Sequence, residues 1–170
     1  MALITADWVR MMDRYNRWQN NNMGLAMASL PLEALLEERG AFFGSILRTA
    51  NHLIWADTIW MARFDGGPKP DASSFDAMSL YGTHTDWATV REPLDQRISK
   101  WANTVTDADL AEDLDWYSGM QDRDITLELG RCVTHFFNHQ THHRGQIHAM
   151  LTNAGAKTED TDLTFMPEGM

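Results

Sequence analysis

The residues best suited to chemistry are histidines, five of which fall in the short stretch between positions 135 and 148. His139 and His143 are four residues apart, so a helix places them one turn apart on the same face. Phe136 and Ile147 continue that face, and their apolar side chains predict that it is turned toward the protein interior. Two inward imidazoles can converge on one cation. The alternative is a histidine stripe on the surface, which the apolar neighbours disfavour.

Two familiar kinds of metal site are excluded by the residues around this pair. A zincin protease needs a glutamate directly after its first histidine, and this chain has Gln140 there. A ferritin-like di-iron site needs a glutamate three residues before its histidine on each of two helices. The residues three before His52, His139 and His143 are Thr49, Phe136 and Gln140. The sequence therefore favours a site for one metal ion, with at least one further ligand from another helix.

The best candidate for that further ligand is His52, which lies in the largely apolar segment 42–65. Asp57 is another polar side chain among the apolar residues of this segment. A buried imidazole or carboxylate needs a partner or a metal. With His139 and His143, His52 would complete three neutral imidazoles, the ligand set of a catalytic zinc-type site with a fourth position open to water or substrate. A hydrogen-bonded core histidine is the alternative for His52.

Other residues near these histidines have more than one interpretation. Asp57 can orient a ligand or act as a base, or it can pair with an arginine or cap local structure. Gln146 can hydrogen-bond a ligand ring and so support the site. Cys132, the one cysteine, is a fourth ligand, a thiol or a buried packing residue. The histidines off the inward face are expected on the surface or beside the site: His135, His142 and His148.

Helical periodicity of the apolar residues predicts four helices. Thr126 is expected to cap the last of them, and Gly155 is expected to end it. Pro93 is expected in the first turn of the third helix, where a proline is tolerated. The expected ranges are about 5–29, 42–65, 93–105 and 126–153.

The connecting segments complete the expected fold. Residues 68–84, rich in proline, aspartate, serine and glycine, indicate a long loop after the second helix. Residues 114–126 suit two short strands or an irregular loop. The acidic residues after about 156 indicate a loosely held tail. Because each helix must bury an apolar face, we expect an all-α four-helix bundle that forms a single domain over residues 1–170.

Composition limits the kinds of partner and the compartment. The formal net charge is −10 at pH 7, and lysine and arginine are scattered, so no nucleic-acid surface is expected. No segment approaches about 18 uninterrupted apolar residues, and the chain does not start with a basic stretch followed by an apolar run. We therefore expect a cytoplasmic protein with no membrane contact. A single cysteine excludes an internal disulfide.

Three strings of residues together resemble the DinB/YfiT-like family: His139-Gln-Thr-His-His143-Arg-Gly-Gln, Asn51-His52-Leu-Ile-Trp-Ala-Asp57 and Tyr15-Asn-Arg-Trp18-Gln-Asn20. Phe42-Phe43-Gly-Ser-Ile46 and Thr126 extend the similarity over most of the chain. The resemblance implies a four-helix bundle in up-down-down-up order. It also implies a homodimer formed through the helices, and a divalent metal such as nickel or zinc on His52, His139 and His143.

The resemblance implies candidate activities as well. Some relatives are transferases or isomerases that use a low-molecular-weight thiol such as mycothiol, bacillithiol or glutathione. We therefore expect metal-dependent thiol transfer, or hydrolysis, on a small molecule. The competing expectation is a non-catalytic module whose histidines stabilise the bundle or bind a ligand without turnover. An open metal position favours the enzyme, and a fourth protein ligand favours the structural role. A third alternative is a site that has decayed into hydrogen-bonded core.

Overall fold

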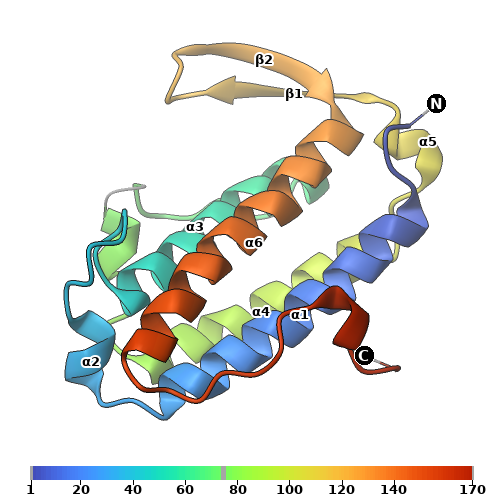
Figure 1. Cartoon of the computed structure of the whole chain (residues 1–170). Helices are drawn as coiled ribbons and strands as arrows, with labels where there is room; N and C mark the ends of the chain where they lie inside the picture. Colours follow the sequence, from blue (N-terminus) through green and yellow to red (C-terminus); the bar gives the residue numbers. More distant parts are fainter. Residues whose placement is uncertain (1, 74–75, 170) are drawn as a thin grey trace.

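The structure is a computed structural model that describes residues 2–73 and 76–169. Within them, long helices pack side by side around a common core (Figure 1). Each packs mainly against two neighbours, in the cyclic order α1, α4, α3, α6. The mostly helical architecture predicted from the sequence is confirmed. The long helices are α1 (Ala6–Ala28), α3 (Ile46–Asp65), α4 (His84–Ala102) and α6 (Leu129–Asn153).

Shorter elements fill the connections between the long helices. The segment before α6 forms an antiparallel hairpin, as one of the two alternatives for it predicted, and the hairpin projects from the end of the bundle where α6 begins (Figure 1). The segment after α3 contains the 3-10 turn η1 and leads back along the bundle to the start of α4 (Figure 1). The short elements are α2 (Leu32–Leu36), η1 (Asp76–Ser79), α5 (Asp107–Leu110), β1 (Asp113–Ser118), β2 (Arg123–Glu128) and η2 (Leu163–Phe165).

The core is formed by apolar side chains from all four long helices, and their burial is the main force that holds the bundle together. Each large aliphatic or aromatic side chain contributes about 1.5–3 kcal/mol when it is fully removed from water. Core residues with almost no exposure include Val9, Met27, Ile46, Leu47, Trp87, Ile98, Phe136, Phe137 and Ile147.

No described helix has both the length and the hydropathy to cross a membrane.

Local signals set most helix ends. The Thr5 hydroxyl accepts a hydrogen bond from the Trp8 amide and caps α1, as predicted. Ser45 caps α3 in the same way, so this helix begins a few residues later than expected. Gly66 ends α3 with a φ of 70°, and Gly155 follows α6 with a φ of 86°. Glycine adopts these left-handed conformations without strain, which is why both helices stop there.

The prediction that Thr126 caps the last helix is wrong. Thr126 lies in β2 opposite Asp115, and its hydroxyl donates a hydrogen bond to the Asp115 carboxylate. Helix α6 begins at Leu129, after Glu128, whose side chain makes no capping bond. Pairing between the two strands therefore places Thr126 in β2 and not at the start of α6.

The prediction that Pro93 lies in the first turn of its helix is also wrong. Thr83 caps α4, and Pro93 lies inside the helix, more than two turns after its start. Proline cannot donate the backbone hydrogen bond of that turn. The helix continues through it because Trp87 and Leu94, on either side, are buried in the core. The free energy gained by burying these side chains therefore exceeds the cost of the missing backbone hydrogen bond.

The C-terminal segment is attached to the bundle, in contrast to the loosely held tail expected from its acidic sequence. The Tyr15 hydroxyl donates a hydrogen bond of 2.6 Å to the Thr161 carbonyl. The Gln19 side-chain amide donates one of 3.0 Å to the Asp160 carbonyl. These contacts use the tail's backbone, so the acidic side chains remain at the surface.

Candidate metal centre

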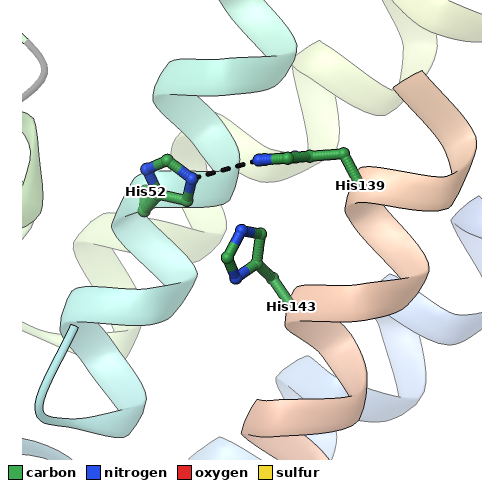
Figure 2. A group of neighbouring side chains, drawn as sticks. All are labelled: His52, His139 and His143. Carbon is green, nitrogen blue, oxygen red and sulfur yellow. Dashed lines mark hydrogen bonds between the residues drawn. The ribbon is translucent and has the colours of Figure 1, made fainter. Parts of the chain in front are cut away.

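Three imidazoles meet between α3 and α6. His52 projects from α3, and His139 and His143 project from α6 toward it (Figure 2). Each histidine offers one ring nitrogen, and these three atoms all lie within 4.8 Å of one another. The Nε2 atoms of His52 and His139 are 3.3 Å apart. The three histidines identified from the sequence therefore form one group that could hold a metal ion.

Gln146 fixes the orientation of one of these rings. Its Oε1 lies 2.8 Å from Nδ1 of His143, on the next turn of the same helix. An amide oxygen can only accept a hydrogen bond, so Nδ1 of His143 carries the proton. Nε2 of His143 is then the nitrogen with a free lone pair. Gln146 thus lies where the sequence placed it, behind a candidate ligand ring.

Burial keeps the three rings in the neutral form that metal binding requires. Desolvation, together with a smaller effect of His143, lowers the pKa of His52 to about 4. Desolvation, together with the neighbouring histidines, lowers the pKa of His139 to about 3. The pKa of His143 is also lowered, again mainly by desolvation, although the bond to Gln146 opposes the shift. At neutral pH all three rings are uncharged.

The donor set fits a divalent transition metal. Two nitrogens bound at about 2.0–2.1 Å to a tetrahedral cation lie about 3.3–3.4 Å apart, which matches the 3.3 Å between His52 and His139. Among the described residues, no thiol or carboxylate joins the group. Cys132 is buried elsewhere on α6, and its pKa is raised by desolvation. The histidines, cysteine and carboxylates of the described residues therefore offer three ligands to such an ion and no fourth.

An aromatic rim surrounds the histidines. The Phe43 ring stacks on His52 at 4.0 Å between centroids and lies 5.4 Å from His143. Trp55 lies on another side of His52, at 6.2 Å. His135 extends the rim, 5.7 Å from His139. The nitrogens of the triad thus lie beside aromatic side chains, the kinds of group that small-molecule sites combine.

A buried polar network lies directly behind the triad. Asp57 accepts a hydrogen bond of 2.6 Å from Arg91 on α4 and one of 2.9 Å from Gln140 on α6. Arg91 also lies 2.8 Å from Asp95, which accepts a hydrogen bond from Asn20 on α1. Burial opposes the charge on Arg91, but Asp95 and Asp57 outweigh it and raise its pKa. Of the roles open to Asp57, the structure shows the contact with an arginine.

Sequence reasoning did not identify Arg91 as the partner of Asp57, or Phe43 as part of the rim. Arg91 did carry a signal, because it falls on the buried face of its helix with Trp87 and Leu94. A charge on an apolar face needs a partner, which holds for Arg91 as it does for Asp57. Phe43 precedes its helix, and no periodicity could place it against His52.

Together these features define a helical bundle with a group of three histidines between two neighbouring helices. Residues 7–169 match the DinB family, and the chain belongs to that family. It is 26% identical over 160 residues to Protein DinB of Bacillus subtilis (strain 168), covering 92% of each chain. Its fold is similar to the crystal structure of a DinB-like protein from Bacillus cereus, with a TM-score of 0.63 and 17% identity over 85% of this chain and 91% of that chain.

The lowered pKa values predict how stability depends on pH in metal-free protein. His52 and His139 have pKa values of about 4 and about 3 when folded, below the ordinary 6.5 that applies after unfolding. As the pH falls below about 6.5, the unfolded chain takes up protons first, so the free energy of unfolding should fall. Denaturant titrations with a chelator, between about pH 7 and pH 4, measure this.

Burial raises the pKa of Asp13 to about 6, so protonation of Asp13 has the opposite effect on the free energy of unfolding. Because Asp13 is present in every variant, differences between variants isolate the histidine contribution. The decline should be shallower in His139→Gln than in wild type. His84→Gln, which changes a histidine outside the triad, should leave the decline unchanged. Equal slopes for wild type and His139→Gln would contradict the assignment.

Proposed function

We propose that this protein binds one divalent metal ion, nickel or zinc, through His52, His139 and His143, and uses it to transfer a thiol to, or hydrolyse, a small molecule. The observation that carries this proposal is the set of three neutral imidazoles with no fourth ligand from the described chain. When bound, such a cation acts as a Lewis acid and lowers the pKa of a thiol or a water molecule. A cytoplasmic homodimer belongs to the same proposal.

The surrounding residues support the site without contacting the reacting atoms. Gln146 holds the proton of His143 on Nδ1 and leaves Nε2 for the metal. Asp57 acts through Gln140, which lies between His139 and His143 in the sequence, so this bond fixes α6 against α3. We assign both Asp57 and Gln146 positioning roles. The aromatic rim excludes water from one side of the site and provides an apolar surface for substrate.

Metal retention tests the ligand assignment. Purified wild-type protein should contain about one equivalent of metal, and His139→Ala/His143→Ala should lose it, because one imidazole cannot hold the ion alone. His135→Ala/His142→Ala is the matched control, since it removes two exposed histidines from the same helix. Elemental analysis after dialysis provides the measurement. Full metal content in the first variant would refute the assignment.

Turnover tests whether the site is catalytic. Metal-loaded protein should transfer glutathione, bacillithiol or mycothiol to an apolar electrophile, or hydrolyse a small substrate, and chelation should abolish the activity. His52→Ala should reduce the rate at least about tenfold, the effect of losing about 1.4 kcal/mol of transition-state stabilisation. Activity that survives both chelation and His52→Ala would favour a non-catalytic metal module.

A further inference from the structure

A cavity of about 320 Å³ lies between α1, α6 and the C-terminal segment, at the lower end of the usual range for small-molecule sites. Its lining includes Arg144 and Gly145 from α6 and Tyr15 from α1, but none of the three triad histidines. The cavity is therefore separate from the metal centre.

The C-terminal segment closes one side of this cavity. It turns back after α6 and runs across α1 (Figure 1). The bonds from Tyr15 to Thr161 and from Gln19 to Asp160 hold it there, and the Thr158 hydroxyl lies 3.5 Å from Nε2 of His148. Both Tyr15 and Gln19 also line the cavity. The tail is thus part of the cavity wall.

Arg144 is the unusual residue of the wall. Arg144 is only 8% exposed, yet its direct contacts are with uncharged groups. Its guanidinium donates to the Asn16 side-chain oxygen, lies 3.5 Å from the Thr141 hydroxyl and lies over the Tyr15 ring, 5.7 Å from the ring centroid. Within the described residues, no carboxylate lies at ion-pair distance from it. The buried Arg91, in contrast, has two aspartates. Asp57 and Asp95 act on Arg144 only from beyond ion-pair distance. A buried cation with no anion in direct contact is costly unless a ligand supplies one.

The rest of the lining indicates the kind of anion. Asn22 also lines the cavity, and its Nδ2 is a buried donor without an acceptor in the described part of the chain. Met23, Ala26 and Leu151 provide an apolar floor. Glu159 also lines the cavity, so the net positive charge available is small. A monoanion with a hydrocarbon body suits this wall better than a phosphate dianion does.

We propose that this cavity binds a small organic carboxylate. The carboxylate accepts hydrogen bonds from the Arg144 guanidinium, a geometry for which the planar group is well suited. The hydrocarbon part lies against the apolar floor, and the C-terminal segment covers the ligand. The site is distinct from the metal centre and does not depend on it.

Isothermal titration of the full chain with hydrocinnamate tests this proposal, and its neutral amide, hydrocinnamamide, is the matched ligand control. Hydrocinnamate should bind with one-to-one stoichiometry and the amide at least about tenfold more weakly, a difference of about 1.4 kcal/mol. Inorganic phosphate should not compete. Absence of saturable hydrocinnamate binding below about 10 mM, equal binding of the amide, or full competition by phosphate would overturn the proposal.

Two variants locate the binding. Gly145→Leu fills the cavity from a position where an added Cβ meets no atom within 4 Å, so the fold should tolerate it. Arg144→Met removes the cation. Both should lose hydrocinnamate binding, while Ala149→Leu, an exposed change on the same helix, should retain it. Retained affinity in a folded Gly145→Leu protein, checked by circular dichroism, would place the ligand elsewhere and refute the assignment.

Discussion

The position of the histidine triad depends on the buried contact of Asp57 with Arg91 and Gln140, because this contact joins α3 to α4 and α6 behind the site. Removing one partner of such a buried pair typically costs about 3–5 kcal/mol, whereas an exposed pair contributes about 0–1 kcal/mol. Helix α1 joins the same polar network through Asn20, whose side-chain amide donates a hydrogen bond to Asp95 on α4. Apolar burial supplies the driving force for packing, and the polar contacts select the register in which His52 faces α6.

Helix α6 has different chemistry on its two sides. Toward α3 it presents neutral imidazoles, whose charge is suppressed by burial and which can therefore donate lone pairs to a cation. Toward α1 it presents Arg144, a buried cation whose pKa burial lowers to about 10. Consecutive residues, His143 and Arg144, face these two environments because a helix turns by about 100° per residue. One short stretch of sequence thus contributes to both the histidine triad and the cavity beside α1.

Residue spacing was sufficient to predict the helical class and the grouping of His52, His139 and His143, because both follow from helical periodicity and from the cost of burying polar groups. Residue spacing was not sufficient to predict the positions of Thr126 and Pro93 in their elements. Thr126 pairs with a residue of the other strand, and packing of distant side chains overrides the local preference of Pro93. Local patterns do not encode such long-range contacts.

The most direct test of the central claim is X-ray absorption at the metal edge of the protein as purified, which counts the ligand atoms. We expect three imidazole nitrogens and one exchangeable light atom at about 2.0–2.1 Å, with a sulfur at about 2.3 Å only after a thiol is added. A fourth ligand from the protein, a sulfur present before any thiol is added, or fewer than three imidazoles would contradict an open three-histidine centre.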